Sequence, residues 1–167
     1  MWLSPALVAL FLPGALFAAG LVLLRDHPGF LWLADAAQFP WELWVIALAG
    51  VAANCGGVLD WAYHRSGRAA VGRAEHRSEL AALAAGGLPL FVLMALASVL
   101  ERPGILLLPI IVTVLFTATM ICYDEFVFHR RRCGRYETVL HRLLVFGNGV
   151  AWLAWMHWCF VGGEAYG

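Results

Sequence analysis

Five apolar segments, each about as long as a helix that crosses a lipid bilayer, limit the folds open to this chain. They cover residues 3–24, 41–64, 80–100, 104–128 and 139–161. A spanning helix needs about 20 mainly apolar residues. The chain has 167 residues and is 62% hydrophobic, whereas an ordinary soluble domain is about half apolar. The sequence therefore predicts a single all-α integral membrane domain over residues 1–167, with five transmembrane helices.

The first apolar segment lies where a signal peptide would lie. However, no basic residue precedes its apolar run, and the run is longer than the ~7–15 residues typical of a signal peptide. We therefore expect residues 3–24 to form a true transmembrane helix at the periphery of the domain. The link at 25–40 contains Pro28, Gly29 and Pro40, which predicts a short amphipathic or irregular segment.

Positive charge is concentrated in two short stretches. All eleven basic residues are Arg, and nine of them lie within 65–77 or 130–142. Because basic loops stay in the cytoplasm, the pattern predicts a multi-pass protein of the cell (inner) membrane with a cytoplasmic N-terminus. Interfacial tryptophans agree with this, since the topology places four of them at the outer ends of helices: Trp41, Trp44, Trp155 and Trp158. Lipid is the expected partner, and nucleic acid is not.

A pattern of acidic residues and histidines occurs twice, next to the two Arg clusters. The first copy is Asp60-x3-His64, a turn, then Glu75-His76-x2-Glu79. The second copy is Glu125-x3-His129, a turn, then Glu137-x3-His141. The stretches 55–80 and 120–145 thus form an internal duplication of helical hairpins, within repeat A at 41–100 and repeat B at 104–161. Two such hairpins predict a four-helix bundle from the second to the fifth helix.

The polar residues of both copies fall at one depth. At about 1.5 Å per residue, Asp60 lies roughly 28 Å from Trp41 along its helix, and His141 roughly 25 Å from Trp158. Glu79 and Glu125 each come out about 31–33 Å from the turn at 101–104. Four helices therefore bring carboxylates and imidazoles to the inner edge of the membrane.

Carboxylates and imidazoles at one level are the ligand types of a metal centre. Carboxylates can bridge and neutralise two cations, and a mixed nitrogen and oxygen set suits iron, manganese or zinc. We predict two metal ions, most simply iron, with eight ligands: Asp60, His64, His76, Glu79, Glu125, His129, Glu137 and His141. Glu75 is the alternative ligand on the third helix, because it shares a face with Glu79.

This arrangement resembles the di-iron carboxylate four-helix-bundle proteins, including ferritin-like, alternative-oxidase-like and hemerythrin-like proteins. The resemblance covers only the four helix ends, and Asp/Glu-x3-His stands where those proteins carry Glu-x-x-His. It implies an oxidoreductase at the cytoplasmic membrane face that acts on oxygen or a lipid-soluble substrate and takes electrons from a donor.

Three other functions fit the same residues. A zinc pair would favour a membrane hydrolase, because zinc lowers the pKa of bound water. A metal carrier or sensor would bind ions without catalysis, although transport sites usually lie near the midplane of the membrane. A metal-free network would pair these residues with the neighbouring Arg or relay protons.

Overall fold

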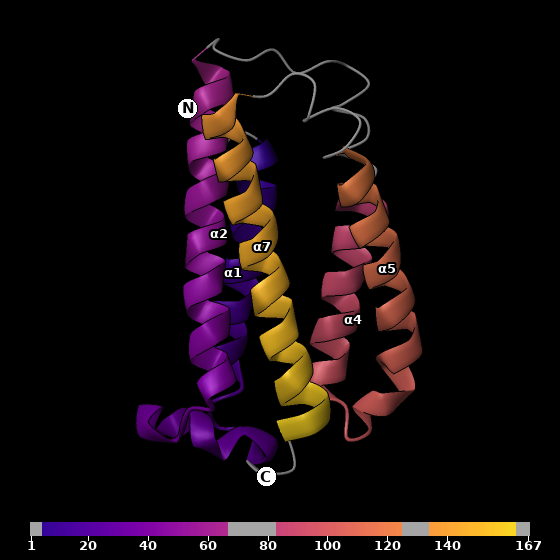
Figure 1. The fold of residues 1–167 in the computed structure, drawn as a ribbon. Helices are drawn as coiled ribbons and strands as arrows, with labels where there is room; N and C mark the ends of the chain where they lie inside the picture. The colour runs from indigo at the N-terminus through magenta and orange to yellow at the C-terminus, as the bar shows by residue number, and fades with distance from the viewer. Residues whose placement is uncertain (1–4, 67–82, 125–133, 163–167) are drawn as a thin grey trace. The chain divides into compact units, whose positions relative to one another are not determined.

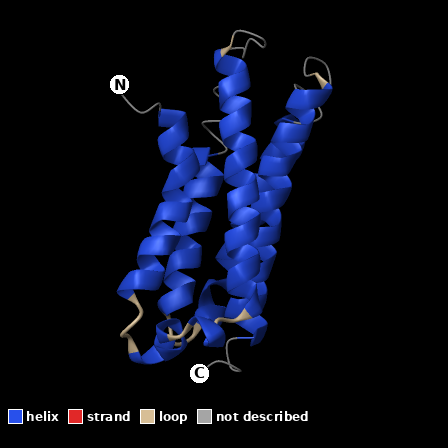
Figure 2. Cartoon of the chain, turned by 90° about the vertical axis from the view of Figure 1, so that its left-hand side faces the viewer, coloured by secondary structure: helices blue, strands red, loops and turns tan. Residues whose placement is uncertain are grey.

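A computed structural model describes residues 5–66, 83–124 and 134–162, and these residues are almost entirely helical (Figure 2). The described residues form five α-helices: α1 (Pro5–Leu23), α2 (Trp41–Arg65), α4 (Leu88–Val99), α5 (Leu107–Asp124) and α7 (Arg135–His157). Short 3-10 or π turns flank them: η1 (Pro28–Ala34), η2 (Ala36–Gln38), η3 (Leu83–Gly87), η4 (Pro103–Leu106) and η6 (Trp158–Gly162). The prediction of an all-α fold is confirmed for these residues.

Three helical stretches among the described residues are long and apolar enough to cross a membrane. They are Trp41–Arg65, Pro103–Tyr123 and Arg135–Gly162. A fourth span exists if Leu7–Leu23 and Pro28–Ala34, which meet at 101°, are one broken span, and Ala85–Val99 is a shorter apolar helix. The structure is thus that of a membrane protein with three to four candidate spans. Five spans and a four-helix bundle remain predictions.

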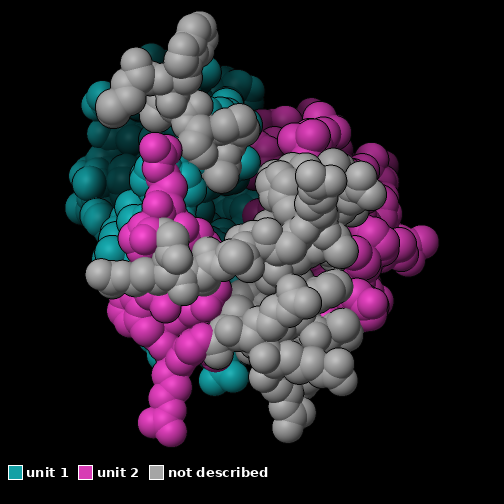
Figure 3. Space-filling view, turned by 90° about the horizontal axis from the view of Figure 1, so that it is seen from above, with its two compact units in different colours: residues 1–62, 139–167 teal, residues 63–138 magenta. Residues whose placement is uncertain are grey.

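The chain divides into two compact units (Figure 3). One comprises residues 1–62 and 139–167, and the other residues 63–138. Both boundaries fall inside continuous helices, since α2 runs through residue 62 and α7 through residue 139.

In the first unit, α1, α2 and α7 lie side by side (Figure 1). Glycines bring the backbones close together. A Cβ atom on Gly56 of α2 would lie 3.0 Å from the carbonyl oxygen of Leu140, and one on Gly147 of α7 would lie 2.9 Å from that of Ala49. The side chain of Leu10 of α1 fills the space over Gly57. Small residues at such contacts are the usual means of packing helices in lipid.

The link between α1 and α2 builds an aromatic core at one end of this unit. His27 and Asp35 cap η1 and η2 by accepting hydrogen bonds from the backbone N–H groups of Gly29 (3.1 Å) and Ala37 (2.9 Å). The core contains four buried residues, Phe30, Trp32, Leu33 and Leu43, with Phe17, Leu21, Leu24, Phe39 and Trp158 packed against them. The link is irregular, as the sequence predicts. Trp155, near the end of α7, is buried and contacts the ring of Phe160.

In the second unit, η3 and α4 pack against α5. The contact is tight at Gly86, where an added Cβ would collide with the Thr117 hydroxyl. That hydroxyl donates a hydrogen bond to the carbonyl oxygen of Thr113 (2.8 Å), one turn back on α5. The expected tight turn near residues 101–104 is present as the start of η4 at Pro103.

Candidate metal centre

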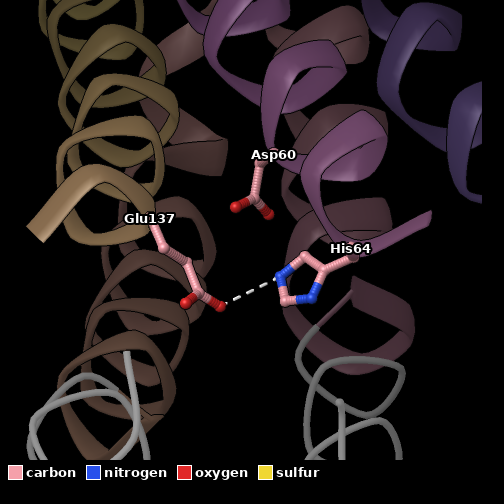
Figure 4. Close-up of side chains that lie close together, drawn as sticks. All are labelled: Asp60, His64 and Glu137. Atoms are coloured by element: carbon pink, nitrogen blue, oxygen red, sulfur yellow. Dashed lines mark ion pairs between the residues drawn. The ribbon is translucent and has the colours of Figure 1, made fainter. Parts of the chain in front are cut away.

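Three potential metal ligands converge where α2 ends and α7 begins. Asp60, His64 and Glu137 each offer one ligand atom, and these atoms all lie within 4.8 Å of one another (Figure 4). His64 Nε2 lies 3.2 Å from Glu137 Oε1. Among the described residues, no other group of three His, Cys, Asp or Glu side chains is close enough to hold an ion.

The helices position these side chains by their register. Asp60 and His64 lie one turn apart on α2 and therefore share a face. Glu137 is in the first turn of α7, which runs antiparallel to α2 along the close contact at Gly56. Gly56 is itself one turn before Asp60. The absence of a side chain at Gly56 thus lets the two helices approach where the ligands meet.

The helix ends suit the places of the carboxylate and the imidazole. The Glu137 side chain is only 5% exposed, and that of His64 is 25% exposed. An acidic residue is stabilised at a helix N-terminus and a cationic one at a C-terminus, and Glu137 and His64 hold these two places. A buried carboxylate also needs a nearby positive charge or hydrogen-bond donor.

The spacing of the three ligand atoms is close to that around a metal ion. Bonds of about 2.0–2.2 Å place the donor atoms of one ion roughly 3–4 Å apart. The 4.8 Å limit that encloses the three atoms is slightly wider. Small side-chain rotations would bring them to bonding distance.

The structure brings together only some of the metal ligands that the sequence predicts. Asp60, His64 and Glu137 come together. His141 lies one turn beyond Glu137 on α7, with its Nε2 atom buried, but it is not part of the triad. The remaining predicted ligands lie outside the described residues: Glu75, His76, Glu79, Glu125 and His129.

Two tyrosines adjoin the triad. Tyr63 precedes His64 and Tyr136 precedes Glu137, and their ring centroids are 5.6 Å apart. The Tyr63 ring also contacts the His64 imidazole edge-on, at 6.2 Å. An aromatic pair thus lies beside the His64–Glu137 contact.

Sequence reasoning missed a second carboxylate–imidazole pair, at the other end of the same two helices. Glu42, in the first turn of α2, is fully buried, and its Oε1 lies 2.6 Å from Nδ1 of His157 in the last turn of α7. These residues are 115 positions apart, so no local spacing connects them. The one available signal was an acidic residue just inside an apolar segment, where an unpaired charge is costly.

Comparisons with protein-family models, with curated proteins and with solved structures find no match to this chain.

Proposed function

We propose that this chain is a membrane-embedded metalloprotein with a dimetal centre, most simply di-iron, at the end of α2 and the start of α7. Asp60, His64 and Glu137 would hold one ion. The second ion would take its ligands from the residues near the two Arg clusters: His76, Glu79, Glu125, His129 and His141. Glu75 is the alternative ligand on the third predicted helix.

The observation that carries the proposal is the third ligand. A carboxylate and an imidazole alone form an ordinary hydrogen-bonded pair, as Glu42 and His157 do at the other end of the same helices. At the proposed centre, Asp60 adds a second carboxylate to His64 and Glu137. Two carboxylates and one imidazole form a mixed oxygen and nitrogen donor set, which suits a bound metal cation.

The ligand chemistry is compatible with a redox metal. A mixed oxygen and nitrogen set suits iron or manganese as well as zinc. Iron at this place would supply oxygen activation or electron transfer. We propose oxidoreductase activity on oxygen or a lipid-soluble substrate, at the cytoplasmic membrane face that the Arg clusters indicate. The chain's own part is to hold the ligands on two packed helices and to keep the site largely dry.

Metal analysis of the purified protein tests this proposal. Protein made without added metal should contain near-stoichiometric iron by elemental mass spectrometry. His64→Ala should lose the ion bound by the triad, whereas His129→Ala should lose only the other one, and the double variant should lose both. His157→Ala is the matched control, because it removes an imidazole from an equivalent carboxylate and should leave the metal content unchanged.

The outcomes separate the competing functions. Wild-type protein without metal, or a His64→Ala variant with unchanged metal, would refute the centre. Stoichiometric zinc with no visible absorption and no response to reductant would instead indicate a hydrolase. Iron that is oxidised by oxygen after reduction would support the proposed activity.

A further inference from the structure

The Glu42–His157 pair is the polar feature that the proposed metal centre does not use. Glu42 lies eighteen residues before Asp60 on α2, which is about 27 Å along the helix at 1.5 Å per residue. The two features therefore occupy opposite ends of the same helix pair. Binding at Glu42 and His157 would therefore not involve the metal ligands.

The buried carboxylate fixes the state of the imidazole. Glu42 is 0% exposed, and its Oε1 lies 2.6 Å from His157 Nδ1, a distance typical of a charge-assisted hydrogen bond. When the carboxylate is ionised, Nδ1 must carry the proton and donate it, because an ionised carboxylate can only accept. In the neutral ring, Nε2 is then the acceptor.

The remainder of the imidazole ring is accessible. The His157 side chain is 44% exposed, while the edge at Nδ1 faces the fully buried Glu42. Within the described part of the chain, the His157 side chain makes no other hydrogen bond. Nε2 therefore has capacity to accept a hydrogen bond from outside the protein.

An aromatic ring lies beside this acceptor, and a second exposed indole lies one turn away on α2. The Trp41 ring lies 5.2 Å from the His157 ring, tilted by 50°, and is half exposed. Trp44, one turn along α2, is also half exposed and contacts Phe39 at 5.8 Å. Indole rings favour the polar boundary of the membrane and pack well against other aromatic rings. A ligand at this place would meet aromatic faces beside one strong acceptor.

We propose that Glu42, His157 and Trp41 form a binding site for the hydroxyl group of an aromatic amphiphile, of the phenol class, at the membrane surface. The ligand's O–H donates to His157 Nε2, and its ring packs against the Trp41 indole. Glu42 holds the imidazole in the accepting tautomer. A metal ion fits less well, because no third ligand among the described residues lies close to this pair.

Two probes that differ only in the hydroxyl test the site. The full chain in lipid nanodiscs is titrated with 2-naphthol and with 2-methoxynaphthalene, which has the same rings but no O–H group. Binding is followed by tryptophan fluorescence and by the ¹⁵N shift of His157 Nε2. Wild-type protein should bind 2-naphthol saturably and at least about fivefold more tightly, the effect of one hydrogen bond of about 1 kcal/mol. The Nε2 resonance should shift only with 2-naphthol.

Variants assign the binding to the pair. His157→Phe should abolish the preference for 2-naphthol, and Glu42→Gln should weaken it. His27→Phe is the matched control and should retain it, because His27 contacts the backbone of its own loop. Equal binding of both probes by wild-type protein would overturn the proposal, even if a variant failed to fold. An unchanged preference in His157→Phe, or displacement of 2-naphthol by equimolar Zn²⁺ with a stoichiometric zinc complex, would also overturn it. The metal content of the proposed centre should be the same in all these variants.

Discussion

Two carboxylate–imidazole pairs join α2 to α7, one at each end, and they follow the same rule. In each pair the acidic residue lies in the first turn of its helix and the histidine in the last turn of the partner helix. Both places are favoured by the helix dipole. In each pair, too, the carboxylate is more deeply buried than the imidazole. Asp60 is what distinguishes the proposed metal centre from the simple pair.

The role of Asp60 can be tested without breaking the His64–Glu137 contact. Asp60→Asn keeps the size of the side chain but removes its charge. We expect metal affinity to fall at least about tenfold. Losing a residue that only hydrogen-bonds a metal ligand already lowers affinity about 10–100-fold. Thermal unfolding of the metal-free protein should change little. Unchanged metal affinity, measured by competition with a chelator, would exclude Asp60 as a ligand.

The burial asymmetry of Glu42 and His157 predicts unequal effects of removing them. His157→Ala removes the imidazole that lies 2.6 Å from a fully buried carboxylate, which should destabilise the protein by about 1–3 kcal/mol. Glu42→Gln removes the charge and keeps a hydrogen-bonding group of similar shape, so its effect should be smaller. Unfolding in detergent, followed by circular dichroism, measures both. A larger loss for Glu42→Gln would contradict the interpretation.

Helix α2 contains one glycine that packs closely against α7, Gly56, and one with open space around it, Gly50. Substituting each of them with alanine gives a matched comparison. A Cβ on Gly56 would lie 3.0–3.2 Å from Leu140, Leu143 and Leu144 of α7, whereas nothing lies within 4 Å of one on Gly50. Gly56→Ala should push the helices apart and destabilise the protein by about 1–3 kcal/mol. Gly50→Ala should be neutral or stabilising by up to about 1 kcal/mol, because alanine favours helix.

Metal binding should follow the same pattern. Gly56 is one turn from Asp60, so separating α2 from α7 there should also weaken the proposed metal centre. Gly50→Ala should leave metal affinity unchanged. Equal behaviour of the two variants would show that the close approach of the helices does not position the ligands.

The hairpin of α4 and α5 offers a double-mutant test. Gly86→Ala would press a methyl group on the Thr117 hydroxyl, and Thr117→Ala would remove that hydroxyl. The Thr117 Cβ would still lie 3.2 Å from the new methyl group, so relief should be partial. We expect Gly86→Ala to be less destabilising in the Thr117→Ala background, with a coupling energy of about 1 kcal/mol. If the two substitutions change the free energy of unfolding additively, Gly86 and Thr117 are not in energetic contact.

The number of spans depends on whether the segment containing α4 crosses the membrane. α4 has 12 residues, fewer than the ~20 of a full span, although η3 precedes it directly. If residues 80–100 span, Ser66 and Gly104 lie on opposite sides of the membrane. In a chain without its native cysteines, an impermeant maleimide should label Gly104→Cys from outside and Ser66→Cys only after lysis. Labelling of both from the same side would exclude a span at 80–100.

The helices themselves could be predicted because a bilayer allows few alternatives. An apolar segment in lipid must satisfy its own backbone hydrogen bonds, and a helix does so within one segment. α2, which begins at Trp41, and α7, which ends at His157, accordingly lie close to the predicted segments 41–64 and 139–161. The shared face of Asp60 and His64 is also local, since it follows from their spacing on one helix.

The partners across helices could not be predicted in this way. Glu137 meets His64, and Glu42 meets His157, because α2 and α7 pack in one antiparallel register. That register depends on contacts such as those of Gly56 and Gly147, where two backbones approach closely. Residue spacing along one helix carries no information about sliding or rotation of its neighbour. Local chemistry thus identifies the ligand types and their faces, while helix packing selects which of them meet.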